Sequence, residues 1–270
     1  MKVTILTVSF NRGDVIRGAM ESVVSQDYDS IEYIVIDGGS TDNTGDEVRA
    51  VRKRVNAPEF KASHPGFSFR AVSEPDHGMY DALNKGLRMA TGDIVGWVHS
   101  DDFLFDEHAV SDIVKAFGEE GVELVYANGV YVDSKNLNRV VRDWRGAPFL
   151  RRKVAAGWLP LHPTCFMRRD VIMQDVLYDT RYSIASDTEF LVHYLYEKDL
   201  KVKFLDRYVV KMRMGGRSTN GRSFWKMFRE DIDVYDSLGM HGFLLKVLKM
   251  LWKVPQYVRP ILNGHQLPQR

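Results

Sequence analysis

Residues 3–13 read VTILTVSFNRG, a run of β-branched and apolar residues that ends at an Asn-Arg-Gly break. Such a run predicts a buried strand followed by a loop. Apolar residues between positions 15 and 24 then recur at a period close to that of a helix. A second apolar run, IEYIVI at residues 31–36, stops at Asp37. The chain therefore opens with a strand, a helix and a second strand.

The same alternation of strand and helix continues to about residue 126. We expect helices at 41–55, 78–89 and 106–118, strands at 69–72, 94–98 and 122–126, and a loop over 56–68. This order is typical of an α/β fold, with right-handed βαβ units and a mostly parallel sheet covered on both faces. Beyond residue 126 the pattern weakens. There we expect strands near 129–133, 138–143, 201–205 and 208–212, and a helix over 187–200.

The composition is that of an ordinary globular enzyme, with 44% hydrophobic and 27% charged residues among 270. A net charge of +1 gives no overall attraction to nucleic acid. A single cysteine, Cys165, excludes a disulfide within the chain and argues against a cysteine-based zinc site. The N-terminal apolar run is too short for a signal peptide, and no apolar stretch is long enough to span a membrane. We therefore expect a cytoplasmic protein.

Polar clusters follow the ends of four predicted strands, at Asn11-Arg12, 37–42, 74–77 and Asp101-Asp102. In open α/β sheets, ligands bind beyond the carboxyl ends of the strands. Two adjacent carboxylates at the end of a buried strand need a neutralising charge, which a magnesium or manganese ion would supply. Alternatively, Asp102 is the N-cap of the next helix.

Taken in order, these clusters and several later ones resemble one enzyme family. The matching stretches are 7–12, 36–42, 73–86, 90–93, 100–102, 162–164, 184–187 and 215–218, within about residues 1–220. The chain resembles the inverting nucleotide-sugar glycosyltransferases of family 2, which have the GT-A fold. The resemblance implies transfer of a sugar from a nucleotide-diphosphate donor to an acceptor hydroxyl.

By this resemblance, one group of residues would hold the donor. The base and ribose would contact Val8, Ser9, Asn11, Arg12 and Asp37, and the sugar and diphosphate would contact Glu74, Asp76, Asp81, Asn84 and Lys85. Asp81 and Asn84 could instead stabilise their own helix, and Lys85 could be solvated. Family members often carry a base-contacting aspartate where this chain has Gly38, so UDP, GDP and dTDP donors remain open.

The resemblance also implies the catalytic groups. Asp102 would bind a divalent metal, Mn²⁺ or Mg²⁺, that stabilises the leaving diphosphate, and Asp101 would reach the ribose or the metal. Asp187, at the start of a helix, would be the general base, unless it is only a cap. Glu189 is the alternative base. Four further residues are candidate acceptor or diphosphate contacts, with structural or salt-bridge roles as the alternatives: His162, Arg217, Arg168 and Arg169.

We expect residues 1–220 to form the catalytic domain, with a nucleotide-binding half at 1–126 and an acceptor half at 127–220. Residues 221–270 would form a helical extension. Within it, residues 243–254 place three lysines on one helical face and leucines on another, which is typical of a helix lying on an anionic membrane. Packing on its own domain and a dimer contact are the alternatives.

The acceptor would be a carbohydrate or a lipid-linked sugar, in cell-surface polysaccharide or glycolipid assembly at the cytoplasmic face of the inner membrane. A dehydrogenase is excluded, because residues 9–13 lack the Gly-x-Gly turn that binds its cofactor. The rival hypotheses are a catalytically inactive protein of the same fold that serves in an assembly, and, more weakly, a glycoside hydrolase.

Overall fold

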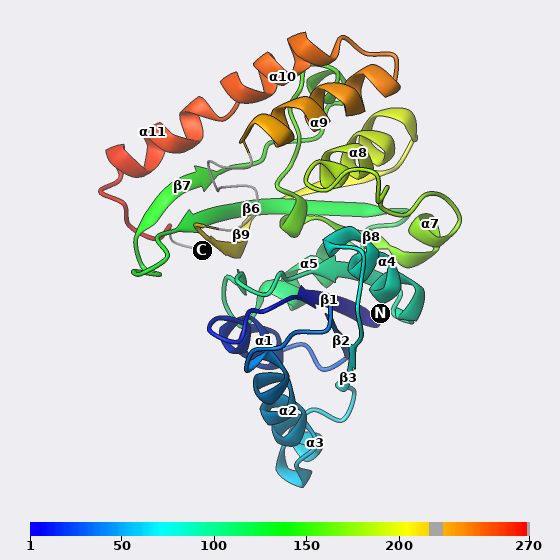
Figure 1. Cartoon of the computed structure of the whole chain (residues 1–270), viewed down its shortest axis with the longest axis vertical. Helices are drawn as coiled ribbons and strands as arrows, with labels where there is room; N and C mark the ends of the chain where they lie inside the picture. The colour runs from blue at the N-terminus through cyan, green and yellow to red at the C-terminus, as the bar shows by residue number, and fades with distance from the viewer. Residues whose placement is uncertain (216–223, 269–270) are drawn as a thin grey trace.

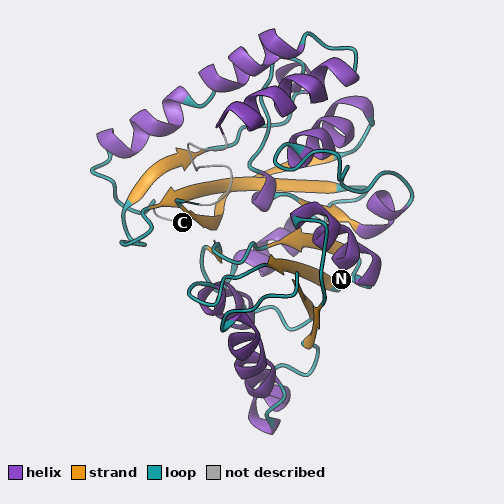
Figure 2. Cartoon of the chain, viewed as in Figure 1, coloured by secondary structure: helices purple, strands orange, loops and turns teal. Residues whose placement is uncertain are grey.

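The computed structural model describes residues 1–215 and 224–268. Its first half alternates as predicted (Figures 1 and 2), through β1 (Val3–Ser9), α1 (Ile16–Val24), β2 (Ile31–Asp37), α2 (Thr44–Val55), α3 (Pro58–Ser63), β3 (Ser68–Ser73), α4 (Met79–Met89), β4 (Ile94–Trp97), β5 (Phe103–Leu104) and α5 (Ala109–Ala116). The second half contains β6 (Leu124–Val132), β7 (Val140–Trp144), α6 (Arg151–Val154), a 3₁₀ turn (His162–Thr164), β8 (Phe166–Arg168), α7 (Arg169–Met173), α8 (Ser186–Val192), β9 (Val202–Arg213), α9 (Phe224–Ser237), α10 (Gly242–Leu251) and α11 (Val254–Leu262).

The described strands form one sheet in the order β3-β2-β1-β4-β8-β6-β9-β5, with β7 added beside β6. The expected parallel arrangement is confirmed for β1 to β4, where β1 pairs with β2 and β4 and β2 pairs with β3. Strands β6 and β9 are also parallel. The remaining pairs are antiparallel: β8 with β4 and β6, β7 with β6, and β5 with β9. A single sheet therefore runs through both of the expected halves.

Helices cover both faces of this sheet, as the alternation predicted. All seven residues of β1 and of β2 are buried, because each strand packs against helices on both sides. On one face, α1, α2 and α5 contribute side chains such as Ile16, Val51 and Ile113. On the other face, α4 and α8 contribute side chains such as Leu83 and Phe190. Two packed layers therefore hold the strand ends that carry the polar clusters.

Several boundaries differ from the sequence prediction. The loop expected over 56–68 contains α3, with Pro58 in its first turn, where proline is favourable. The strands expected at 122–126 and 129–133 are one strand, β6, since Gly129 lies inside it. A Cβ atom at Gly129 would lie 2.6 Å from Leu161, so the glycine serves close packing rather than a turn. The strands expected at 201–205 and 208–212 are likewise one, β9.

Helix α8 ends at Val192 and continues as a π turn over His193–Glu197, so the helix predicted over 187–200 is shorter than expected. The three C-terminal helices lie at the opposite end of the molecule from α2 and α3 (Figure 1). Helix α9 packs against α8 and α10, and α11 packs against β7. Among residues 1–215 and 224–268, no helix has the length and apolarity needed to cross a bilayer.

Candidate active site

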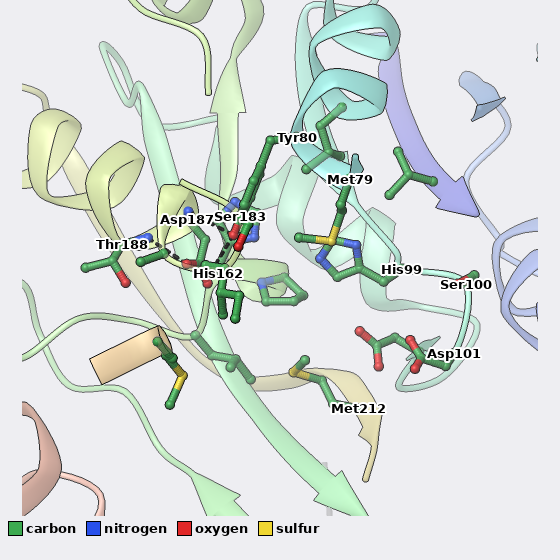
Figure 3. A pocket seen from close by; sticks show the side chains of 18 of the residues that line it. Met79, Tyr80, His99, Ser100, Asp101, His162, Ser183, Asp187, Thr188 and Met212 are labelled. Carbon is green, nitrogen blue, oxygen red and sulfur yellow. Dashed lines mark hydrogen bonds between the residues drawn. The ribbon is translucent and has the colours of Figure 1, made fainter. Parts of the chain in front are cut away.

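A cavity of about 690 Å³ opens beyond the carboxyl ends of β1 and β4. Its walls come from the loop after β1, the loop at residues 99–102, the start of α4, residues 159–163, the start of α8, helices α9 and α10, and Lys253 just before α11. Figure 3 shows Ser100 and Asp101 on one side of it, Asp187 and Thr188 on the other, and His99 and His162 between them. The pocket therefore joins strand-end loops to a C-terminal wall.

The loops after β1 and β2 are tied together at one end of the pocket. The backbone amide of Asn11 donates to Ser40 Oγ (2.7 Å), and Asn11 Oδ1 accepts from the amide of Thr41 (2.9 Å). Asn11 holds a left-handed backbone with φ of 51°, a conformation that asparagine tolerates well. Asp37 accepts from the Ser40 amide (3.1 Å) and from Ser73 Oγ (2.6 Å). Asp37 thus holds the β2 loop in place just behind the pocket wall.

Gly38 lines the pocket beside Asp76. A Cβ atom at Gly38 would lie 2.4 Å from Asp76 Oδ2, closer than real Cβ contacts come. The Asp76 carboxylate is oriented by the amide of Gly78, which donates to its Oδ1 (2.8 Å). A larger side chain at position 38 would have to displace that carboxylate. The absence of a side chain at Gly38 therefore lets Asp76 reach this part of the wall.

Asp102 is 1% exposed, and its carboxylate is only partly satisfied. Its Oδ1 accepts from the backbone amide of Arg213 (3.2 Å). Its Oδ2 is buried and has no hydrogen-bond partner among the described residues. Burial raises the pKa of Asp102 well above its ordinary value, and the neighbouring Asp101 adds to this rise. Asp101 itself faces the Arg12 guanidinium at 4.0 Å. A buried carboxylate oxygen without a hydrogen-bond partner is stable only when the group is protonated or lies beside a cation.

Two imidazoles form the middle of the pocket wall. His99 and His162 stack with ring centroids 6.2 Å apart. Burial, together with His99, lowers the pKa of His162 to about 3, so His162 is neutral at physiological pH. Its Nε2 hydrogen-bonds the hydroxyl of Tyr178 (2.6 Å), which fixes the ring. Burial also lowers the pKa of His99, whose Nδ1 has no partner among the described residues. Both rings present neutral, polar edges rather than charges.

Asp187 lies in the first turn of α8, on the side of the pocket opposite Asp101 (Figure 3). Its Oδ1 accepts from the amide of Thr188 (2.8 Å). Burial raises the pKa of Asp187, Lys249 opposes that rise, and Asp231 adds to it. A carboxylate with a raised pKa is a stronger base than an ordinary aspartate. The position and environment of Asp187 therefore suit proton abstraction.

The turn before Asp187 is held from α9. The Glu230 carboxylate accepts from the backbone amides of Ile184 (2.8 Å) and Ala185 (3.0 Å). The Tyr80 hydroxyl donates to the carbonyl of Ile184 (2.6 Å) from α4. Residues from two helices far apart in sequence thus set the backbone from which Asp187 projects.

Comparison with known proteins shows the family of this chain. A family model described as "Glycosyl transferase family 2" matches residues 4–177. The chain belongs to glycosyltransferase family 2. An uncharacterised glycosyltransferase of Mycobacterium tuberculosis is 35% identical over 194 residues, which are 70% of this chain and 67% of the relative. A PGL/p-HBAD biosynthesis glycosyltransferase of M. tuberculosis is 26% identical over 218 residues, 80% of this chain and 78% of the relative. The protein is a glycosyltransferase.

Solved structures confirm the fold expected for the family, GT-A. Staphylococcus aureus TarS 1–349 in complex with UDP-GlcNAc has a TM-score of 0.64 at 17% identity, over 97% of this chain and 73% of that one. The mannosyltransferase PcManGT of Pyrobaculum calidifontis, in complex with GDP-Man and Mn²⁺, has a TM-score of 0.60 at 17% identity, over 97% of this chain and 74% of that one. This glycosyltransferase spans 39% of a longer TarS structure.

The structure brings many of the predicted site residues of this glycosyltransferase into one pocket. Those that line it are Val8, Ser9, Asn11, Arg12, Asp76, Asp101, Asp102, His162 and Asp187. Three others, Glu74, Asp81 and Lys85, form an ion-pair cluster outside the lining, with Lys85 Nζ 3.1 Å from Glu74 and 3.8 Å from Asp81. Their contact with the donor stays a prediction. Arg217 lies outside the described residues.

Four further predicted residues lie outside the pocket lining, and their contacts with substrate stay predictions. The side chain of Asn84 is buried and binds the backbone of Tyr178, donating from its nitrogen (2.8 Å) and accepting at its oxygen (2.9 Å). Arg168 and Arg169 each donate from Nε to a backbone carbonyl and also lie outside the lining. Glu189 also lies outside the pocket lining, and its role as the alternative base stays a prediction. Asn84 connects α4 to the segment that carries Tyr178.

The lysines of residues 243–254 do not form an outward basic face. Lys246 is 1% exposed and pairs with Asp231 inside the molecule. Lys249 and Lys253 line the active-site pocket. The expectation that this lysine face meets anionic lipid is therefore wrong. The spacing of the three lysines along the helix can be read from the sequence. Which way the lysine face points depends on how the helix packs against the rest of the protein.

Sequence reasoning also missed Arg142 as a pocket residue. It comes from β7, where a lone arginine in a strand gives no signal of a site. Its position beside the pocket follows from the pairing of β7 with β6 and from the docking of α11 against β7.

Proposed function

We propose that this glycosyltransferase moves a sugar from a nucleotide-diphosphate donor to an acceptor hydroxyl, with inversion at the anomeric carbon. The observation that carries the proposal is one pocket with the unpartnered carboxylate of Asp102 on one side and the base-like carboxylate of Asp187 on the other. The loops at residues 8–12 and at Gly38 and Asp76 would bind the nucleotide. This assignment makes residues 1–126 the donor half and residues 127–220 the acceptor half.

The residues around Asp102 fit a divalent metal ion, Mn²⁺ or Mg²⁺. The free Oδ2 of Asp102 and the nearby Asp101 offer hard oxygen ligands. Among the described residues no group of three or more His, Cys, Asp or Glu side chains forms a complete cage. Magnesium-type ions are commonly held by one or two carboxylates together with substrate phosphates, which matches this sparse set. When bound, the ion would offset negative charge on the leaving diphosphate.

Asp187 would act as the general base. Its carboxylate would accept the proton of the acceptor hydroxyl while that oxygen forms a bond to the anomeric carbon. The bond from the anomeric carbon to the diphosphate oxygen breaks on the opposite face, and the nucleotide diphosphate leaves with the electron pair. One displacement of this kind inverts the anomeric configuration. Glu230 and Tyr80 would hold the turn before Asp187 so that its carboxylate stays within reach.

We further propose a role in glycolipid or cell-surface polysaccharide assembly, on a carbohydrate or lipid-linked acceptor at the cytoplasmic face of the inner membrane. The name of the M. tuberculosis PGL/p-HBAD relative supports a glycolipid role. The outer sides of α9 to α11 expose large apolar side chains, including Trp225 (69%), Phe243 (65%), Leu251 (59%) and Ile261 (66%). Residues 238–270 contain no aspartate or glutamate. Such a surface suits insertion into a membrane interface, through apolar contact rather than through the lysines.

The test begins with donor binding. Thermal unfolding is followed with UDP and GDP, with and without Mn²⁺, and then release of nucleotide diphosphate from UDP- and GDP-sugars is measured. Asp102→Asn should lose the Mn²⁺-dependent rise in Tm. Asp187→Asn should keep that rise but turn over roughly 10²- to 10⁴-fold more slowly.

Glu189→Gln, also in α8 but outside the pocket lining, tests the alternative base and should retain activity. Full turnover of Asp102→Asn in the presence of a chelator would reject the metal assignment. An unchanged rate in Asp187→Asn would reject the base. Donor binding without turnover of any sugar nucleotide would favour the alternative of a catalytically inactive assembly protein.

A further inference from the structure

The wall of the pocket nearest α10 carries a cluster of buried and half-buried cations. Lys246 and Lys249 both bind Asp231 of α9, Lys249 at 2.7 Å. Lys249 also donates to Thr188 Oγ1 (2.7 Å), which places the cluster beside Asp187 at the start of α8. Burial opposes ionisation of Asp231, but Lys249 and Lys246 hold its pKa well below the ordinary value. Asp231 is therefore an anion already shared by two lysines.

Lys253 is the member of this cluster that lines the pocket without an ion-pair partner among the described residues. Among the described residues, its ammonium has no hydrogen bond and no carboxylate within 4.0 Å, although it lines the pocket. Burial and repulsion from Lys249 and Arg142 lower the pKa of Lys253 to about 7, with Lys246 adding to the repulsion and Asp231 opposing it. Lys253 lies in the short connection between α10 and α11, and both helices fix the position of its backbone at this wall.

Arg142 of β7 is a second cation with unused hydrogen-bonding capacity. It is 5% exposed and is held by Gln256, whose Oε1 accepts from Arg142 Nε at 2.7 Å. Its guanidinium lies over the rings of Trp144 (4.4 Å) and Tyr257 (5.1 Å), which fix its plane. Its Nη2 is buried and has no hydrogen-bond partner among the described residues. Arg142 is thus pre-positioned at the pocket with a free donor.

Two cations of this region lack an ion-pair partner. Lys246 and Lys249 share Asp231, whereas Lys253 and Arg142 have no carboxylate within 4.0 Å among the described residues. Burying unpaired positive charge is unfavourable unless an anion occupies the site. Phosphate and carboxylate groups match an arginine with a free donor and a neighbouring ammonium.

The cluster lies on the acceptor side of the pocket. Lys249 contacts Thr188, and Figure 3 shows Thr188 and Asp187 across the pocket from Ser100 and Asp101. The donor nucleotide is proposed to bind at that other side. We infer that the acceptor carries a negatively charged group, a phosphate or a carboxylate, and that Lys253 and Arg142 bind it while Asp187 faces the acceptor hydroxyl. This inference rests on the proposed function.

The inference is tested by calorimetric titration of the full chain with glycerol 3-phosphate, with glucuronate and with uncharged glycerol. UDP or GDP and Mn²⁺ are present in excess, so that the diphosphate subsite is filled. The two anions separate a phosphate from a carboxylate acceptor. At least one anion should bind while glycerol does not, and Lys253→Met should weaken that binding roughly tenfold to a hundredfold.

Lys253→Arg keeps the positive charge and should restore much of the affinity for the anion. Lys226→Met, on the exposed side of α9, is the matched control and should bind the anion like the unsubstituted chain. Arg142→Met tests the second cation, and circular dichroism checks that it is folded. Equal binding of anions and glycerol, or unchanged anion binding in Lys253→Met, overturns the inference. Failure of the proposed function is seen separately, since UDP and GDP with Mn²⁺ would then leave Tm unchanged in every variant.

Discussion

Replacing Asp231 with asparagine should destabilise this glycosyltransferase more than other single charge removals on α9. Asp231 is 1% exposed, and its carboxylate accepts from Lys249 (2.7 Å), Thr188 Oγ1 (2.9 Å) and Lys246. Asparagine keeps the shape but removes the carboxylate charge that both lysines bind directly. Breaking a buried ion pair by removing one partner costs about 3–5 kcal/mol. For a chain of this size, that corresponds to a fall in Tm of roughly 6–20 °C.

The assay is thermal and urea unfolding of Asp231→Asn beside Asp233→Asn, an exposed neighbour on α9 that accepts from the Tyr182 hydroxyl. Asp233→Asn should stay within about 1 kcal/mol of the unsubstituted chain. The double variant Asp231→Asn/Lys246→Met removes one stranded lysine and should recover part of the lost stability. A loss under about 1 kcal/mol in Asp231→Asn, or no recovery in the double variant, would refute the ion-pair argument.

Two further predictions concern activity and membrane contact. Lys249→Met removes the cation that opposes the raised pKa of Asp187, so this pKa should rise further. Since the base must be ionised, activity would then be lost at a higher pH as the solution is acidified. The acid limb of kcat/KM should move to higher pH, and an unmoved limb would exclude this coupling. The double variant Leu251→Ser/Ile261→Ser should bind vesicles of phosphatidylcholine and phosphatidylglycerol with roughly tenfold lower affinity or less, measured by co-sedimentation. Leu137→Ser, between β6 and β7, is the control, and equal loss there would argue against a specific surface.

Much of the donor side was readable in the sequence. The apolar runs that become β1, β2 and β4 have strand periodicity, and their polar clusters fall where parallel strands end. The order of strands along the chain therefore predicts that Asn11, Arg12, Asp101 and Asp102 lie at the same edge of the sheet. The boundaries of β6 and β9 were not readable, because Gly129 resembles a turn signal but serves close packing against Leu161.

Asn84 shows that a sequence motif does not reveal which of its side chains face the pocket. Its place in a motif-like stretch predicted a donor contact or a role in stabilising its helix, and the structure shows both polar atoms of its side chain bound to the backbone of Tyr178. The residues of a short motif share a helix but not a face, and only the packing of α4 shows which of them face the pocket.

The sequence alone determined the α/β alternation, the family resemblance and the residues at the carboxyl ends of the first strands, because these depend on periodicity and on adjacency along the chain. Only the tertiary structure decided the direction of the lysine face in α10. A helical pattern shows that Lys246 and Lys249 share one side, but not whether that side meets solvent, lipid or protein. Docking on α9 supplied Asp231 as a partner, so the lysines turned toward the pocket and the apolar side chains were left outside.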